Sequence, residues 1–253
     1  MRILTNAVFW AVLLGWAQLS YAELASVAVA SNFSETANLL AKEFNQKTGH
    51  SIRVSAGSSG KLYAQIINGA PFDVFLSADA ERPERIEHEG LAVPGTRISY
   101  AEGTLVLWSR NSRYAGKDCL AVLKDLDFRH LAIANPLTAP YGAAARQWLR
   151  SLGLWEKLRK KIVTGENIGQ AFHFTATRNA DLGLIAAAQL VDERIPEGTC
   201  SYAVPPAGHA PILQQGLLLQ RAETNKAARA FLASLRTDAA LEIIRQRGYQ
   251  LPR

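Results

Sequence analysis

The sequence has little of what marks a membrane-spanning or a nucleic-acid-binding protein. After the first 22 residues it contains no apolar run long enough to cross a bilayer. Its Lys and Arg residues form no dense cluster, whereas a nucleic-acid-binding protein normally carries a basic stripe. It contains no internal repeat and no long, polar, repetitive stretch. We therefore expect a globular protein that does not bind nucleic acid.

The sequence also lacks the residue patterns of common catalytic and metal sites. Neither cysteine has metal-ligand spacing around it, and no nucleophile-elbow pattern occurs. The histidines show neither metal nor catalytic-triad spacing; they are His50, His88, His130, His173 and His209. These absences predict a binding protein rather than an enzyme, with no cofactor.

The first 22 residues are the most apolar segment and have the pattern of a removable secretory signal. Arg2 supplies a positive start, residues 7–16 are almost purely apolar, and residues 20–22 offer small residues at the two positions that a signal peptidase inspects. The run is short for a membrane span, so an uncleaved anchor is the weaker alternative. We predict export to the periplasm, with cleavage near Ala22.

The mature chain is large enough for two lobes. Removing 22 of the 253 residues leaves 231, more than the usual size of one domain, and a hydrophobic content of 48% supports a full core. Without Arg2 the formal charge is +5, spread along the chain. A mild positive field fits a protein that meets anions, and it fits simple solubility as well.

Cys119 and Cys200 are the two cysteines of the chain. In an oxidising compartment they can pair and close a loop of about 80 residues. In the chain-entropy model such a cross-link stabilises the fold by roughly 4–5 kcal/mol. We predict the disulfide, with two unpaired buried thiols as the alternative.

Short β-like runs alternate with helix-like runs in both halves of the mature chain. The expected strands cover residues 26–30, 52–54, 73–77, 104–108, 131–134, 162–163, 182–185 and 216–220. The expected helices cover residues 33–44, 62–66, 143–152, 169–177, 227–235 and 241–247. This alternation predicts an α/β fold of two lobes, each with a largely parallel, mixed sheet flanked by helices. We place lobe one at residues 23–106 and 212–253, and lobe two at residues 107–211.

Four strand-to-helix junctions, two in each lobe, carry residues suited to anion binding: residues 30–33, 57–60, 139–142 and 166–169. Each would place a helix N-terminus at the carboxyl end of a strand. There, unpaired backbone N–H groups and the positive end of the helix dipole favour an anion. At the first junction we expect Asn32 to cap the helix, with Glu35 completing a capping box. An anion held from both lobes would close them.

The junctions are rich in neutral donors. Ser31 and Ser59 add hydroxyl groups, and Lys61 is the one basic residue, at the edge of its turn. A fully ionised oxyanion needs donors alone, whereas phosphate keeps a proton near neutral pH and needs an acceptor. This disfavours phosphate, although Glu35 and Glu166 are carboxylate acceptors close to the junctions. About six or seven hydrogen bonds to a charged guest, each worth about 1.5–3 kcal/mol, suffice for micromolar to nanomolar binding after closure costs.

At these same residues the chain resembles the periplasmic molybdate-binding proteins of ABC transporters. The resemblance covers essentially the whole mature chain. Its most specific segments are VASNF at 29–33, GSSGKL at 57–62, GAPFDVFLSAD at 69–79, IANP at 133–136, PYG at 140–142 and RGY at 247–249. The resemblance implies a type II periplasmic-binding-protein fold and a monomer that delivers molybdate or tungstate to a membrane permease.

The resemblance also implies a ligand set made of neutral donors, with the metal held only as its oxyanion. Ser31 and Ser59 correspond to lobe-one ligands through their hydroxyls, and Asn32 contributes its backbone N–H, with its side chain as a further candidate. Ala78 falls where some members offer a backbone group. Tyr141 and Ile168 correspond to lobe-two contacts, largely through backbone N–H.

The chain departs from part of the family at Ala186. Some members place a tyrosine hydroxyl at this position, and the side chain of Tyr141 or Asn32 is the candidate replacement. A protein for another tetrahedral oxyanion, such as sulfate, is the nearest alternative. A ligand-sensing module that acts through a separate membrane receptor is a further one. Molybdate and tungstate have the same charge and shape, so the sequence does not separate them.

Overall fold

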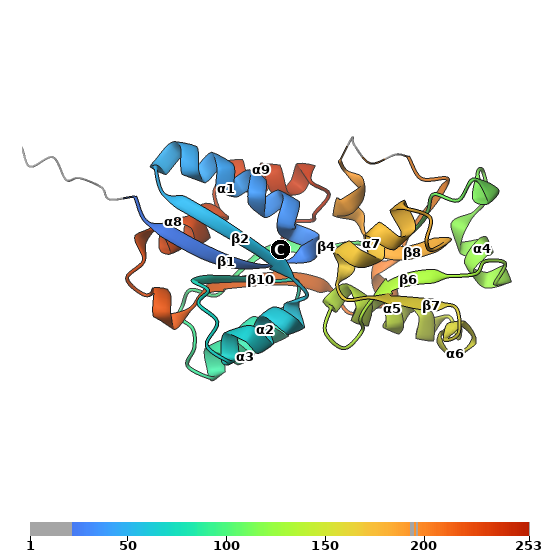
Figure 1. Ribbon diagram of the computed structural model, residues 1–253, viewed down its shortest axis with the longest axis horizontal. Helices are drawn as coiled ribbons and strands as arrows, with labels where there is room; N and C mark the ends of the chain where they lie inside the picture. Colours follow the sequence, from blue (N-terminus) through green and yellow to red (C-terminus); the bar gives the residue numbers. More distant parts are fainter. Residues whose placement is uncertain (1–21, 193–194, 196, 253) are drawn as a thin grey trace, which may run out of the picture.

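The computed structural model describes residues 22–192, 195 and 197–252. The first strand begins at Leu24, so all of the predicted signal segment except Ala22 lies outside the described residues. Within the described part of the chain, no helix is both long and apolar enough to span a membrane. The molecule consists of two lobes that lie side by side, each built on its own five-stranded sheet (Figure 1).

The sheet of lobe one combines parallel and antiparallel strands. In spatial order its strands are β2 (Ser51–Gly57), β1 (Leu24–Ala30), β3 (Val74–Ser77), β10 (Ile212–Leu218) and β4 (Ile98–Gly103). The first three strands are parallel, and β10 is antiparallel to both of its neighbours. The carboxyl ends of β1, β2 and β3 therefore meet at one edge, which faces lobe two (Figure 1).

Helices cover both faces of this sheet, as the alternation of side chains along β1 requires. Val27 and Val29 pack in one cluster with α1 (Ser34–Thr48), α8 (Lys226–Ser234) and α9 (Asp238–Gln246). Ala28 points the other way, into the cluster of α2 (Ser59–Ile67) and α3 (Glu81–His88). Each face is thus sealed by apolar residues spaced at helical intervals, such as Ala37, Leu40 and Phe44 of α1.

Lobe two repeats the arrangement with a second mixed sheet. Its spatial order is β7 (Ile162–Gly165), β6 (Leu131–Ala134), β8 (Leu182–Ala186), β5 (Leu105–Ser109) and β9 (Cys200–Ala203). Its helices are α4 (Cys119–Asp125), α5 (Pro140–Ser151), α6 (Trp155–Leu158) and α7 (Ile168–Ala176). Here β7, β6 and β8 are parallel, and β5 is antiparallel to β8 and β9. The predicted two-lobed α/β fold with mixed sheets is confirmed.

Short turns of 3-10 helix complete the described chain: η1 (Ser31–Phe33), η2 (Ser112–Tyr114), η3 (Ala187–Leu190), η4 (Pro206–Gly208) and η5 (Gln220–Ala222). The chain passes from the first sheet to the second between Gly103 and Leu105. It returns between Ala203 and Ile212. Thus the lobes are joined by two short connections.

The predicted disulfide is present. Cys119 at the start of α4 is bonded to Cys200 at the start of β9, with a Cα–Cα distance of 5.4 Å. Both cysteines are buried in the main apolar cluster of lobe two. The bond therefore ties a helix to the edge strand of the second sheet.

Candidate anion-binding site

A small hollow lies where the two lobes meet. Its lining is drawn from both lobes and consists of Ala30, Ser31, Asn32, Gly57, Ser58, Ser59, Ala78, Ala139, Pro140, Tyr141 and Ile168. Its cavity volume is about 10 Å³. Pockets for organic ligands usually begin near ~300 Å³, so the hollow is far too small for a guest of that kind. The structure brings all six of the sequence-predicted ligand residues to this one hollow.

Four helix starts supply the walls of the hollow. In lobe one, β1 ends at Ala30 and leads through η1 into α1, while β2 ends at Gly57 and leads into α2 at Ser59. In lobe two, α5 starts at Pro140 and α7 at Ile168. The first N–H groups of a helix have no partner inside it, and the helix dipole is positive at that end. The walls are therefore suited to a guest with negative charge.

Ser59 and its neighbour Ser58 form the most buried polar part of the lining. Ser59 is 0% exposed, and its Oγ accepts a hydrogen bond of 3.0 Å from the backbone N–H of Ala78. Because Oγ acts as acceptor there, the hydroxyl hydrogen of Ser59 can point elsewhere. Ser58 is 3% exposed, and its Oγ has no hydrogen-bond partner among the described residues. Both hydroxyls are thus available to a guest in the hollow.

Asn32 is held by residues from far along the chain rather than by its own helix. Its side-chain amide donates to Oε1 of Gln214 at 2.9 Å and to Oη of Tyr249 at 3.3 Å. The carbonyl oxygen of Asn32 accepts a hydrogen bond of 2.7 Å from the Tyr249 hydroxyl. The predicted capping role of Asn32 is wrong, because α1 is preceded by Phe33 and has no side-chain cap. These bonds fix the backbone of Asn32 at the wall of the hollow.

Tyr141 reaches from α5 of lobe two toward the first sheet. A Cβ atom added to Gly103 would lie 2.0 Å from the Tyr141 hydroxyl oxygen, so the side chain occupies the space beside that glycine. Burial, with the nearby Tyr249, raises the pKa of Tyr141 well above its ordinary value. The hydroxyl therefore keeps its proton near neutral pH, and it has no hydrogen-bond partner among the described residues.

Ala186 stands where the resemblance implies a tyrosine in part of the family, and it contacts a glutamine. Oε1 of Gln189 accepts a hydrogen bond of 3.0 Å from the backbone N–H of Ala186. Nε2 of Gln189 donates to the carbonyl oxygen of Ile168 at 3.2 Å. Gln189 thus joins the end of β8 to the first residue of α7, one of the predicted ligands. Sequence reasoning missed this residue, because no local pattern marks its contact with Ile168.

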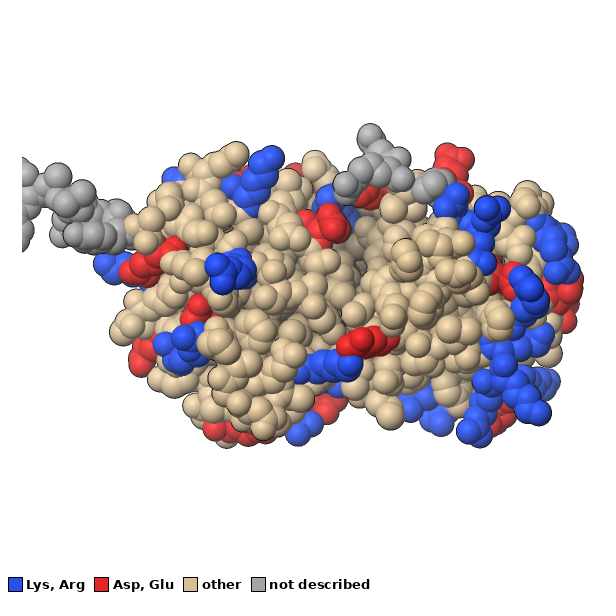
Figure 2. Space-filling view, viewed as in Figure 1, with Lys and Arg blue, Asp and Glu red and all other residues tan. Residues whose placement is uncertain are grey.

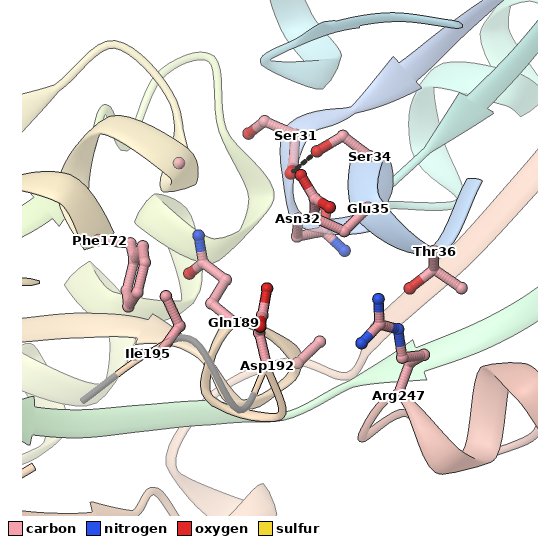
Figure 3. Close-up of a pocket in the computed structure, with 12 residues that line it drawn as sticks. Ser31, Asn32, Ser34, Glu35, Thr36, Phe172, Gln189, Asp192, Ile195 and Arg247 are labelled. Atoms are coloured by element: carbon pink, nitrogen blue, oxygen red, sulfur yellow. Dashed lines mark hydrogen bonds between the residues drawn. The ribbon is translucent and has the colours of Figure 1, made fainter. Parts of the chain in front are cut away.

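A wider cleft of about 380 Å³ shares Ser31 and Asn32 with the hollow. Figure 3 shows that its walls come from the start of α1 on one side and from Phe172, Gln189 and Ile195 of lobe two on the other. Glu35, Asp192 and Arg247 also line this cleft. Charged groups therefore belong to this cleft and not to the lining of the hollow.

Comparisons with known proteins agree with this architecture. The family model described as "Bacterial extracellular solute-binding protein" matches residues 25–250. This chain belongs to that family of solute-binding proteins. Since the family is one of transport rather than catalysis, the solute-binding protein is not an enzyme. In the described part of the chain, no group of three or more His, Cys, Asp or Glu side chains could hold a metal ion.

The solute-binding protein also has close relatives over most of its length. It is 46% identical over 244 residues to a protein from Rhodobacter capsulatus named molybdate-binding protein ModA, covering 96% of this chain and 95% of the relative. It is 46% identical over 225 residues to a protein of the same name from Azotobacter vinelandii, covering 89% of each. The predicted resemblance to this group of proteins is confirmed.

A solved structure shares the fold in detail. The periplasmic molybdate-binding protein of Azotobacter vinelandii matches the solute-binding protein with a TM-score of 0.85 and 40% identity, over 90% of this chain and all of the other. The two mixed sheets flanked by helices are thus those of a periplasmic binding protein, as the resemblance implied.

Proposed function

We propose that this solute-binding protein captures molybdate in the hollow between its lobes and delivers it to the membrane permease of an ABC importer. The relatives at 46% identity are named for molybdate binding and align over nearly the full chain. The ligand set in this proposal is the predicted one: Ser31, Asn32, Ser59, Ala78, Tyr141 and Ile168. The hydroxyls of Ser31 and Ser59 and the backbone N–H groups of Asn32, Tyr141 and Ile168 would hold the four oxygens of the guest, while Ala78, whose N–H donates to Oγ of Ser59, would orient that hydroxyl.

The observation that carries the proposal is the neutral lining of the hollow. None of its eleven described lining residues is Asp, Glu, Lys, Arg or His, and four helix starts face it. A fully ionised dianion could accept hydrogen bonds from both lobes, and no Lys or Arg side chain would be needed to hold it. A protonated oxyanion is best matched by a carboxylate acceptor, and no carboxylate is among the described lining residues, although Oδ1 of Asn32 is a buried acceptor without a hydrogen-bond partner among the described residues. The lining therefore favours molybdate and its isostere tungstate over phosphate.

The energy of such a site is sufficient for tight capture. Each hydrogen bond to a charged group is worth about 1.5–3 kcal/mol net, and the hollow offers at least two serine hydroxyls besides the backbone donors. About six bonds of this kind, less the costs of closure and dehydration, reach the roughly −8 to −12 kcal/mol of micromolar to nanomolar binding.

Calorimetric titration of the purified protein with molybdate, tungstate, sulfate and phosphate tests the proposal. We expect one molybdate or tungstate per chain, much weaker heat from sulfate, and none from phosphate. Equal affinity for sulfate and molybdate would support the sulfate alternative. No binding of any of the four would contradict the assignment of the hollow.

The proposal places the protein in the periplasm as a monomer. Mass spectrometry of protein released by osmotic shock should show a mature N-terminus near Glu23, and its size in solution should match one chain. A protein that remained in the membrane pellet with Met1 intact would contradict this location.

A further inference from the structure

The first turn of α2 does more than line the hollow, because it also touches the opposite lobe. The backbone N–H of Gly60 donates a hydrogen bond of 2.8 Å to the carbonyl oxygen of Thr138, in the loop that precedes α5. A Cβ atom on Gly60 would lie 2.9 Å from that oxygen and 3.0 Å from the Cα of Thr138. Real Cβ atoms rarely approach backbone this closely, so the contact requires a residue without a side chain.

Nothing within α2 itself requires glycine at this position. Gly60 is the second residue of the helix, and its φ is outside the left-handed region that favours glycine. Alanine is a better helix former than glycine, since glycine loses more conformational freedom on folding. The contact with lobe two therefore accounts for a residue that the helix alone would disfavour.

A second contact between the lobes follows directly in the sequence. Lys61 of α2 forms an ion pair with Glu166, the residue two positions before α7 in lobe two. About half of each side chain is exposed, so solvent screens the pair and it stabilises closure weakly. Gly60, Lys61 and Glu166 are all absent from the lining of the hollow. They are therefore placed to act on the lobes and not on the guest.

We infer that Gly60 and the Lys61–Glu166 pair form a latch that sets how fully the lobes close and how long a captured anion is retained. The inference rests on the proposed function, because closure matters only if a guest is held between the lobes. Glycine permits the backbones of the two lobes to meet at hydrogen-bonding distance. The ion pair then adds a contribution that depends on salt. The residence time of the anion is thus controlled by residues that do not touch it.

Gly60→Ala tests the steric part of the latch. The variant should keep the thermal midpoint of the ligand-free protein, since alanine suits the helix, yet it should release molybdate at least tenfold faster in stopped-flow measurements. Small-angle X-ray scattering should show less compaction on adding molybdate than for the unaltered protein. Ala64→Ser, at an exposed position of the same helix, is the control. Unaltered release and compaction in Gly60→Ala would overturn the steric part.

The ion pair is tested by Lys61→Ala, Glu166→Ala and the double variant. Removing Glu166 deletes a negative charge near the guest, so a simple field effect would slow the release of an anion. The latch predicts the opposite: each single variant releases molybdate about two- to fivefold faster at low salt, and the double variant no faster than the singles. The differences should vanish at high salt. Slower release from Glu166→Ala would overturn the role of the pair.

Lys47→Ala is the matched charge control, because Lys47 pairs with Glu43 within α1, on an exposed surface. It should leave molybdate release unchanged. Measurements on the unaltered protein distinguish failure of the proposed function from failure of the latch. If it neither binds nor compacts with molybdate, the proposed function fails. If it does both and all latch variants behave like it, only the latch is refuted.

Discussion

The backbone N–H of Ala78 donates a hydrogen bond to the Oγ of Ser59, and both residues line the same hollow. The bond joins the residue after β3 to the first residue of α2. It fixes the orientation of the Ser59 side chain before any guest arrives. A donor that is oriented in advance costs less conformational entropy on binding.

Ser59→Ala should weaken molybdate binding about 10- to 100-fold, which corresponds to the loss of one hydrogen bond to a charged group worth about 1.5–3 kcal/mol. The ligand-free protein should remain folded, with a thermal midpoint a few degrees lower because Ala78 loses its acceptor. Calorimetry and thermal unfolding measure the two effects. Ser55→Ala, on β2 outside the hollow, is the control. Unchanged affinity in Ser59→Ala would show that this hydroxyl is not a ligand.

Gln189→Ala should weaken molybdate binding about fivefold. The side chain makes two hydrogen bonds that position the start of α7, and the net value of a neutral hydrogen bond is about 1 kcal/mol. Gln189→Glu keeps the acceptor for Ala186 but loses the donor to Ile168, so its affinity should be lower than that of the unaltered protein. Exposed Gln65→Ala serves as the control. The assignment fails if Gln189→Ala and Gln65→Ala bind equally well.

Removing the disulfide should destabilise the protein without changing its ligand preference. Cys119 and Cys200 are separated by 81 positions, and the chain-entropy model gives a stabilisation of about 4 kcal/mol for a loop of this length. The Cys119→Ser, Cys200→Ser double variant should unfold at clearly lower urea concentration, and reducing agent should have the same effect on the unaltered protein. An identical urea midpoint for oxidised and reduced protein would contradict this.

Asp181 should make stability depend on acidity. Burial alone would raise the pKa of Asp181, but hydrogen bonds from the backbone N–H groups of Arg129 and His130 and from the Asn111 amide outweigh it, and the pKa is lowered. The stabilisation is therefore complete above the unfolded pKa near ~4 and is lost as the pH falls through the lower folded value. Asp181→Asn should cost about 2 kcal/mol of unfolding free energy at pH ~7 and much less near pH ~3. An equal cost at both pH values would refute this linkage.

Much of the fold could be predicted because local patterns reflect the final packing. The buried run of β6 was predicted with its bounds, and the apolar spacing of α1 ends at Gly49, which adopts the left-handed conformation expected of a helix C-terminus. The junctions before α5 and α7 were found for the same reason. Where a helix starts at the end of a strand, serine, asparagine, proline and glycine residues mark the junction in the sequence.

Other elements were missed because distant parts of the chain create them. Strand β9 pairs only with β5, about 90 residues earlier, and its four residues carry no alternation of their own. Helix α3 is short and mostly charged. Its buried residues are Pro83 and Ile86, which are too few to show a helical pattern in the sequence. Asn32 has a good local reason to cap α1, but Gln214 and Tyr249 bind its side chain instead. No window of sequence around Asn32 contains either partner.

Because the lining of the hollow is uncharged, its response to changes in pH is small. Of the described residues that line it, Tyr141 is the only one with an ionisable side chain, and its pKa is raised well above the ordinary value. The lining of the hollow therefore keeps the same protonation state in acidic and in mildly alkaline surroundings. Uptake from an environment of changing acidity would then be limited by the chemistry of the dissolved metal, as long as the pH stays within the range in which the fold itself is stable.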